Sequence, residues 1–228
     1  SLGDLMDHVA DKGVAENTLI LFVGDNGSDG PLGDTYGYFS SAPLRGKKGT
    51  CYEGGMRVPF IASWAKAGKA NPFKIARNHL HHEQIGTVMD IYSTIVDASN
   101  SSSPPKHPVD GASLLPQLSG KNNKERPDHF MCHFPHSHRS SYFTSFRKGD
   151  WKLIYRYLTT AGKRKNKQPL PKYELYHLKN DPYETKNLAP ENSKKTNEMI
   201  RLMTEQLEKE NALFPVQDGI ELRPQPIN

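Results

Sequence analysis

Apolar residues in the first half of the chain follow helical and strand patterns in turn. Between residues 2 and 9 they recur at helical spacing, and Gly13 stands where that helix would end. Unbroken apolar runs follow at 19–23 and 59–64, and helical spacing returns at 85–96. A short apolar run behind a helix is typical of a strand buried on both faces of a parallel sheet. This half of the chain therefore predicts an α/β domain with buried strands.

The pattern changes near Asp128, after a proline-rich break at 99–108 and a short helix predicted at 111–118. Beyond it, short aromatic-rich runs are separated by turn residues, which is typical of an antiparallel sheet. These runs lie at 130–134, 142–146, 151–157 and 173–178, and an amphipathic helix is expected within 190–213. The chain should therefore divide into an α/β part at 1–127, a small antiparallel-sheet subdomain with a C-terminal helix at 128–214, and a tail at 215–228.

Composition narrows the class of protein only slightly. The chain has 228 residues, a formal net charge of +5 and a sequence pI of about 9.0. That surplus favours an anionic partner but is too small for a nucleic-acid tail, and the basic stretch at 163–172 fits either a solvated loop or a polyanion contact. No apolar run approaches the roughly 20 residues of a membrane span. Because the sequence opens inside a predicted helix, we expect a fragment of a longer protein.

Asp25 and Asn26 follow the first predicted strand, and Gly27 comes next. Ligand sites in open α/β sheets lie beyond the carboxyl ends of the strands. A carboxylate beside a side-chain carbonyl suits a hard cation such as calcium, which takes about six to eight oxygens, so two ligands alone are too few. An ordinary Asn-Gly turn is the simpler interpretation of these residues taken alone.

Residues 44–59 are dense in glycine and in cations. Glycine lets a backbone approach a ligand closely, and lysine offers a compact positive charge for an oxyanion. Taken without its context, the segment fits a solvated loop equally well.

Together, these two segments resemble the sulfatase family of the alkaline phosphatase superfamily. Sulfatases carry a strand that ends in Asp-Asn-Gly, followed by Leu-Arg-Gly-x-Lys-Gly-(Ser/Thr)-x-(Trp/Tyr)-Glu-Gly-Gly-x-Arg-Val-Pro-Phe, and residues 44–60 match nearly every fixed position. The runs at 109–115, 147–153 and 174–184 are also similar to family segments. The resemblance is closest to arylsulfatases and N-acetylgalactosamine-6-sulfatases, and it implies the C-terminal part of an alkaline-phosphatase-like α/β sandwich.

The resemblance also assigns roles to individual residues. It makes Asp25 and Asn26 ligands of one calcium ion, and Lys48 the catalytic lysine that contacts the sulfate. Lys47 stands where the family usually has a small residue and receives no role. His136 lies in a stretch that faces the cleft in similar sulfatases and is a candidate substrate contact, with a polar loop as the alternative. The implied reaction is hydrolysis of sulfate esters, with those of carbohydrates expected.

The chain departs from the family pattern at the nucleophile. Sulfatases use a formylglycine made within Cys/Ser-x-Pro-x-Arg, and neither Cys51 nor Cys132 stands in such a motif. The two cysteines form neither metal spacing nor a disulfide framework. We therefore expect the formylglycine and the remaining calcium ligands in an N-terminal portion of the same protein, and this chain alone to be inactive and a weak calcium binder.

Two other functions remain open from the sequence. One is hydrolysis of phosphate or phosphonate monoesters, although phosphatases of the superfamily more often carry Asp-His where this chain has Asp25 and Asn26. The other is a non-catalytic protein that binds sulfated glycans. By resemblance the protein is secreted, periplasmic or lysosomal, and substrate specificity is expected in the 28–42 loop and in 133–139.

Overall fold

The computed structural model describes residues 1–29, 41–101, 108–136, 142–159 and 169–227. These residues form two compact units that both use separate parts of the chain. The first unit contains residues 1–25 and 58–128, and the second contains 26–57 and 129–228. Within the described residues, no helix is both long and apolar enough to cross a membrane.

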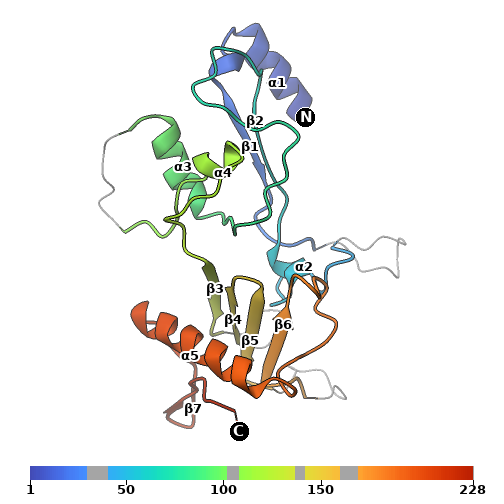
Figure 1. Cartoon of the computed structure of the whole chain (residues 1–228), viewed down its shortest axis with the longest axis vertical. Coiled ribbons are helices and arrows are strands. Elements are labelled where there is room, and N and C mark those ends of the chain that lie inside the picture. Colours follow the sequence, from blue (N-terminus) through green and yellow to red (C-terminus); the bar gives the residue numbers. More distant parts are fainter. Residues whose placement is uncertain (30–40, 102–107, 137–141, 160–168, 228) are drawn as a thin grey trace. The chain divides into compact units, whose positions relative to one another are not determined.

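The first unit begins with helix α1, which spans Leu2–Asp11 (Figure 1). The hydroxyl of Ser1 accepts the Asp4 N–H at 3.4 Å and caps the helix, while Gly13 has a φ of +71° just beyond its end. A short 3-10 turn, η1 (Ala15–Asn17), leads into strand β1. The predicted helix and the glycine that ends it are confirmed.

Strand β1 (Leu19–Val23) pairs antiparallel with β2 (Phe60–Trp64) in a two-stranded sheet. The expectation of strands buried in a parallel sheet is therefore wrong for the described chain. Phe22 is 49% exposed and Ile61 60% exposed, because a sheet of two strands leaves apolar side chains uncovered unless other elements pack on it. The apolar run predicted the strand itself but not the direction of its neighbour.

Helix α3 (Asp90–Ala98) begins five residues later than the sequence pattern predicts. The carboxylate of Asp90 accepts the N–H of Thr87 at 2.5 Å and that of Ala112 at 2.9 Å, and it also pairs with Arg126. These contacts hold the chain before Asp90 in a turn. Helix α4 (Leu115–Leu118) is likewise only the last part of the short helix expected at 111–118.

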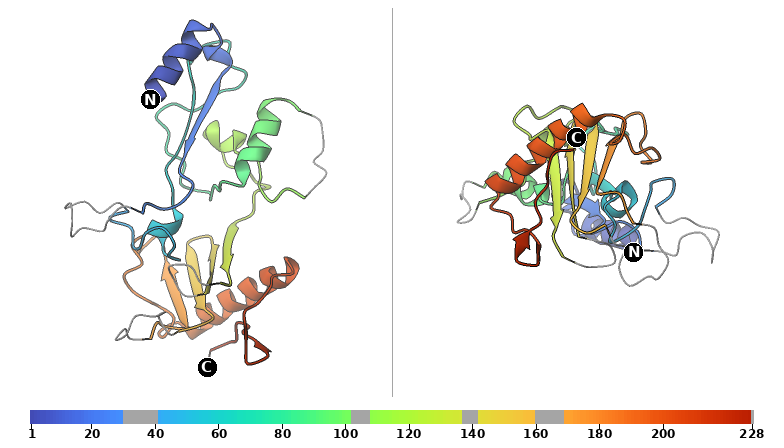
Figure 2. Two further views of the ribbon diagram at one scale, coloured as in Figure 1. Left: turned by 180° about the vertical axis from the view of Figure 1, so that it is seen from behind. Right: turned by 90° about the horizontal axis from the view of Figure 1, so that it is seen from below.

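The second unit contains the antiparallel sheet that the aromatic runs predict, and its strands pair in sequence order. Helix α5 (Ser193–Lys209) lies across this sheet, as expected from the amphipathic pattern (Figures 1 and 2). The four strands are β3 (His129–Phe134), β4 (Phe143–Lys148), β5 (Trp151–Arg156) and β6 (Tyr173–His177). A short helix, α2 (Glu53–Met56), and a small hairpin of β7 (Val216–Gln217) and β8 (Ile220–Glu221) complete the unit.

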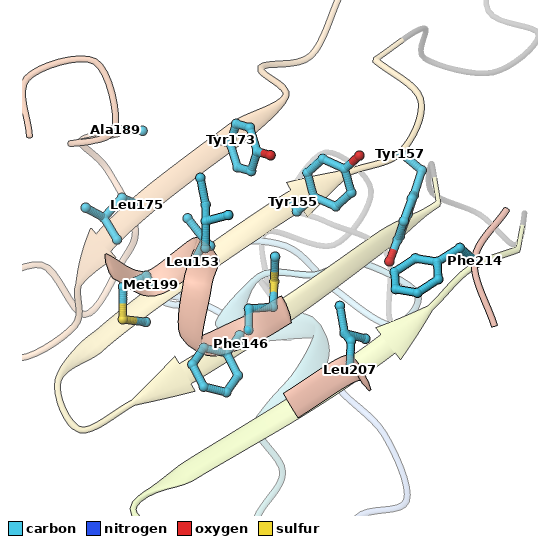
Figure 3. Close-up of a cluster of buried hydrophobic side chains, with 12 residues drawn as sticks. Phe146, Leu153, Tyr155, Tyr157, Tyr173, Leu175, Ala189, Met199, Leu207 and Phe214 are labelled. Carbon is cyan, nitrogen blue, oxygen red and sulfur yellow. The ribbon is translucent and has the colours of Figure 1, made fainter. Parts of the chain in front are cut away.

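The apolar core of the second unit lies between α5 and one face of the sheet (Figure 3). Met203 and Leu207 from the helix and Leu153 and Leu175 from the strands are all completely buried. Burying each such side chain contributes on the order of 1.5–3 kcal/mol. This cluster holds the helix on the sheet.

Two segments outside the four strands and α5 also belong to the second unit. Residues 26–57 belong with the sheet rather than with the strand that precedes them, and residues 215–228 belong to the same unit. The last segment is held in place, because Gln225 and Ile227 accept hydrogen bonds from Tyr173 and Asn197 through their backbone carbonyls at 2.7 and 2.9 Å.

Candidate functional site

The face of the sheet opposite α5 receives the glycine-rich segment 45–57. Side chains alternate across a strand, and Leu153 and Tyr155 face α5. The side chains of Lys152, Ile154 and Arg156 therefore point away from the helix. Cys51 packs on this face in a second buried apolar cluster with Phe143, Ile154, Tyr176 and Leu178. The segment that contains Lys48 is therefore part of the subdomain's second core.

Asn26 and Lys48 are brought together by backbone hydrogen bonds. The Lys48 N–H donates to the carbonyl of Ser28 at 3.0 Å, and the Gly27 N–H donates to the carbonyl of Gly55 at 3.1 Å. The turn that follows Asp25 is thus hydrogen-bonded to the glycine-rich segment at two points, Lys48 and Gly55. Asp25 itself is exposed and is the last residue of the first unit before the chain enters the second.

Three glycines permit this close packing. A Cβ on Gly27 would lie 2.3 Å from the carbonyl oxygen of Gly54, and one on Gly55 would lie 2.4 Å from that of Thr50. A Cβ on Gly54 would meet the carbonyl oxygen of Arg45 at 2.6 Å. Contacts that short do not occur, so any side chain at these positions would separate the turn from the segment.

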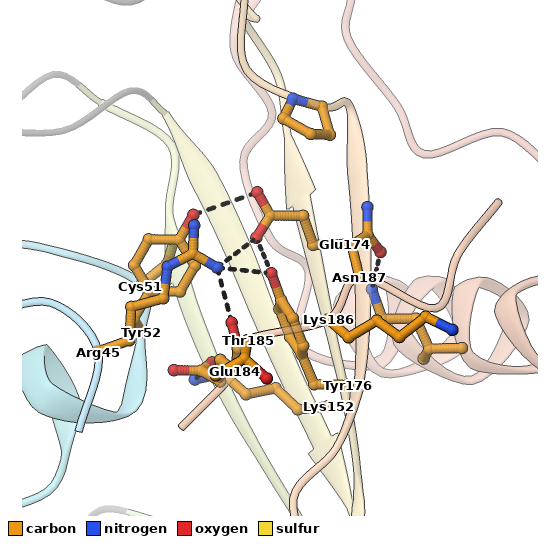
Figure 4. Close-up of polar contacts among 12 residues, drawn as sticks. Arg45, Cys51, Tyr52, Lys152, Glu174, Tyr176, Glu184, Thr185, Lys186 and Asn187 are labelled. Carbon is orange, nitrogen blue, oxygen red and sulfur yellow. Dashed lines mark hydrogen bonds and ion pairs between the residues drawn. The ribbon is translucent and has the colours of Figure 1, made fainter. Parts of the chain in front are cut away.

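A cluster of hydrogen-bonded polar side chains fixes the centre of the segment, and Figure 4 shows its members Arg45, Tyr52 and Glu174. Arg156 donates to Glu174 at 2.8 Å and to the hydroxyl of Tyr52 at 2.9 Å. The other oxygen of Glu174 accepts the Tyr176 hydroxyl at 2.5 Å, and Arg45 donates to that hydroxyl at 2.8 Å. Burial, which opposes the phenolate, raises the pKa of Tyr52 to about 12, so its hydroxyl stays neutral and continues to act as a donor.

A second buried group fixes the start of α2. The Lys152 ammonium lies 2.8 Å from Glu53 and 2.8 Å from Glu184, and all three side chains are buried. The second carboxylate oxygen of Glu184 accepts the Glu53 N–H at 2.7 Å. Burial raises the pKa of the Glu184 carboxyl although Lys152 opposes the shift.

Neither cysteine fits a nucleophile. Cys51 is 3% exposed, and burial raises the pKa of its thiol to about 11 although Arg156 and Lys152 act in the opposite direction. A thiolate is the reactive form of cysteine, and almost none forms at neutral pH in such surroundings. The pKa of Cys132 is also raised by burial.

His136 is exposed and lies just beyond the end of β3, with its ring 3.9 Å from that of Phe134 between centroids. Phe134 stacks on Phe143, which belongs to the same apolar cluster as Cys51. His136 thus stands on the face of the sheet that carries the glycine-rich segment. Most of the 28–42 loop and residues 137–139, in which specificity was expected, lie outside the described residues.

The side chains of Asp25 and Asn26 both carry oxygen atoms of the kind that calcium binds. The amide nitrogen of Asn26 donates to the Gly27 carbonyl at 2.9 Å, and its amide oxygen accepts no hydrogen bond from the described residues. A carboxylate and an amide oxygen are both hard donors, so the residue types fit this ion. In the part of the chain that the structure describes, no three His, Cys, Asp or Glu side chains gather closely enough to hold a metal.

Sequence reasoning missed the residues that hold the segment in place. Lys152, Glu174 and Glu184 lie within runs that are similar to family segments, but the sequence assigns them no role. A charged residue flanked by apolar residues in a strand, as at Lys152 and Glu174, is the signal that could have found them, because it places a charge on a buried face. The partners of Lys152 are far away in the sequence and could not be inferred.

Solved structures identify the fold class to which this arrangement belongs. A 2-O GAG sulfatase superposes with a TM-score of 0.65 at 21% identity, over 91% of this chain and 40% of that one. The phosphonate monoester hydrolase of Silicibacter pomeroyi superposes with a TM-score of 0.62 at 20% identity, over 99% of this chain and 42% of that one. The predicted class, an alkaline-phosphatase-like α/β fold with a small antiparallel-sheet subdomain, is confirmed.

The family model of the N-sulphoglucosamine sulphohydrolase C-terminal region matches residues 46–212, and the chain belongs to this sulfatase family. A sulfatase of Formosa agariphila is 32% identical over 79% of this chain and 30% of its own length. Human N-acetylgalactosamine-6-sulfatase is 27% identical over 95% of this chain and 42% of its own length. The chain therefore spans well under half the length of these curated relatives.

Proposed function

We propose that the protein containing this chain hydrolyses sulfate esters, and that Lys48 contacts the sulfate group. The attachment of the Lys48 segment to the Asn26–Ser28 turn supports this proposal. A hydrogen bond from Lys48 to Ser28, another from Gly27 to Gly55 and close glycine packing join the segment to the turn that contains Asn26, our proposed metal ligand. Membership of the sulfatase family supports the same reaction.

The chemistry of the transferred group explains why a fixed lysine is useful. Negative charge develops on the sulfuryl and leaving oxygens as the S–O bond breaks. An ammonium group that is already in place stabilises this charge without reorganisation. Asp25 and Asn26 would supply two oxygen ligands to calcium, which would add a second positive charge at the sulfate when bound. By resemblance, the formylglycine and the other ligands lie outside this chain, in an N-terminal portion of the same protein.

Carbohydrate sulfates are the substrate class we propose. Two names support this class. The matched family is named after a sulphated glucosamine, and the human relative is named after a sulphated N-acetylgalactosamine. His136 is our candidate for a contact to the sugar, because its ring is exposed and packs against the ring of Phe134. By the same resemblance we propose a secreted, periplasmic or lysosomal location.

Paired lysine variants of the full-length protein test the role of Lys48. Lys48→Ala should lower kcat/KM for a sulfate ester on the order of 10²–10³-fold, because a preorganised charge at the transition state is lost. The matched control is Lys47→Ala, the adjacent lysine of the same segment, which should change kcat/KM by less than about threefold. Equal effects of the two substitutions would rule out a specific role for Lys48.

Hydrolysis of a phosphonate or phosphate monoester is the second candidate, favoured by the structural similarity to the phosphonate hydrolase. Comparing the sulfate and phosphate esters of one phenol on the full-length protein separates the two reactions, and faster turnover of the phosphate ester would favour the alternative. If neither ester is turned over but a sulfated glycan still binds, the protein is a non-catalytic glycan-binding protein.

A further inference from the structure

Glu184 contacts both ends of the part of the glycine-rich segment that carries Lys48. Its backbone carbonyl accepts a hydrogen bond from Arg45 at 2.9 Å. Its carboxylate accepts the Glu53 N–H at 2.7 Å and lies 2.8 Å from Lys152. Lys48 stands between Arg45 and Glu53 in the sequence, so one buried residue holds the segment on both sides of the lysine.

The backbone of Glu184 is itself held in a conformation that costs energy. Its φ of +55° lies in the left-handed region, which residues other than glycine rarely adopt. The preceding turn keeps it there, because Asp181 accepts the N–H groups of Thr185 and Lys186, both at 3.0 Å. Such conformations persist only where the surroundings determine them strongly, and they gather at functional sites.

Stability alone is a weak reason for this buried cluster. Two charged groups removed from water lose hydration that their attraction only partly restores, and apolar residues of similar volume often stabilise a core as well or better. The same face of the sheet does accept apolar residues, since Ile154 is completely buried beside Cys51. What the ion cluster adds is direction, because Lys152 donates a hydrogen bond to the Glu53 carboxylate at 2.8 Å and Glu184 accepts one from the Glu53 N–H at 2.7 Å.

We propose that Glu184, acting with Lys152, is a positioning residue that fixes the Lys48 segment for sulfate binding. Glu184 does not touch the substrate; it determines where Lys48 stands by holding Arg45 and Glu53. This inference rests on the proposed function, because it assumes that Lys48 contacts the sulfate. It adds two residues from the antiparallel sheet and its following turn to the machinery of that site.

A double-mutant cycle in the full-length protein tests this coupling. Glu184→Gln keeps the volume of the side chain and an oxygen for the Glu53 N–H, but removes the charge that Lys152 faces. It should lower kcat/KM for a sulfate ester on the order of 10- to 100-fold, as expected when a catalytic group is displaced slightly. In a Lys48→Ala background the same substitution should have an effect of less than about threefold, because the group to be positioned is gone.

Arg45→Ala provides a second variant in case Glu184→Gln does not fold. The side chain of Arg45 is 42% exposed, so its loss disturbs the core less, yet it removes the hydrogen bond to the Glu184 carbonyl. It should show the same dependence on Lys48. The matched control is Lys186→Ala, since Lys186 belongs to the same turn (Figure 4) but its ammonium pairs, among the described residues, with the exposed Glu191 at 2.7 Å.

Inhibition by inorganic sulfate gives a readout that does not depend on the chemical step. The inhibition constant should rise in Glu184→Gln and in Arg45→Ala, and it should stay unchanged in Lys186→Ala. Equal losses of kcat/KM with and without Lys48, or wild-type kinetics in a folded Glu184→Gln, would overturn the positioning role alone. Wild-type kinetics in Lys48→Ala itself would instead overturn the proposed function on which the role rests.

Discussion

The four-stranded sheet of the second unit has two buried faces, and they are made of different kinds of residues. Towards α5 it presents Leu153 and Leu175, which meet Met203 across an apolar interface. On the other face Lys152 and Arg156 are buried just as deeply, at 1% and 2% exposure. Residues of β5 thus alternate between an apolar face towards α5 and the opposite face, here called the ionic face, on which Lys152 and Arg156 are buried on either side of the apolar Ile154.

This contrast separates two tasks of one sheet. Apolar contacts are non-directional, so the α5 face can stabilise the subdomain while tolerating small shifts. Hydrogen-bonded ion pairs act only at particular distances and angles, so the opposite face fixes the position of the 45–57 segment. The predictions that follow test whether stability and geometry really divide in this way.

The largest effect on stability is expected on the ionic face. Lys152→Ala leaves Glu53 and Glu184 buried without their shared cation and should cost about 3–5 kcal/mol. Hydrogen exchange of the β5 amides in the full-length protein measures this cost. The matched control is Arg201→Ala, which breaks an exposed pair with Glu205 at 2.5 Å and should cost only about 0.3–0.5 kcal/mol. Similar costs for the two would mean that burial of the ions has no special consequence.

A truncation on the apolar face should reduce stability with little change in chemistry. Met203→Ala removes a completely buried side chain from α5 and should cost about 3 kcal/mol in the same exchange experiment. At a temperature where the variant is folded, its kcat/KM should stay within about twofold of wild type. A loss of turnover as large as that of Glu184→Gln would show that the α5 face also positions the segment, and the division into two tasks would fail.

The smallest effect concerns pH on the α5 side of the sheet. Burial lowers the pKa of His133, although its hydrogen bond to the Leu213 carbonyl at 2.8 Å acts in the opposite direction. The unfolded chain therefore takes up a proton near the usual value of about 6.5 while the folded state stays neutral. The unfolded state then binds more protons, so the contribution of His133 is complete above that pH and is lost as the pH falls.

Hydrogen exchange of the β4 amides at several pH values measures this change in stability. His133→Gln should remove the part of the pH dependence that begins as the pH falls below about 6.5, because glutamine does not titrate there. An unchanged slope in the variant would mean that other groups cause it. A slope of opposite sign in the wild type would contradict the lowered pKa.

The secondary structure of the second unit could be predicted from the sequence because it depends on local patterns. Short aromatic runs divided by turns gave the strands, and apolar spacing at 190–213 gave α5. The first unit was less predictable. Helix α3 starts late because Asp90 binds backbone groups before and after it, and Phe22 and Ile61 are exposed because an apolar run does not specify what covers it.

The sequence by itself determined the family of this chain and its candidate site residues Asp25, Asn26 and Lys48, since these lie in short segments whose order is recognisable. Tertiary structure alone decided how Lys48 is held. Glu53 and Glu184 stand 131 positions apart, and their meeting depends on how the sheet folds back on the segment. Ion pairs between residues far apart in the sequence produce no periodic pattern, because each partner is an ordinary charged residue in its own local sequence.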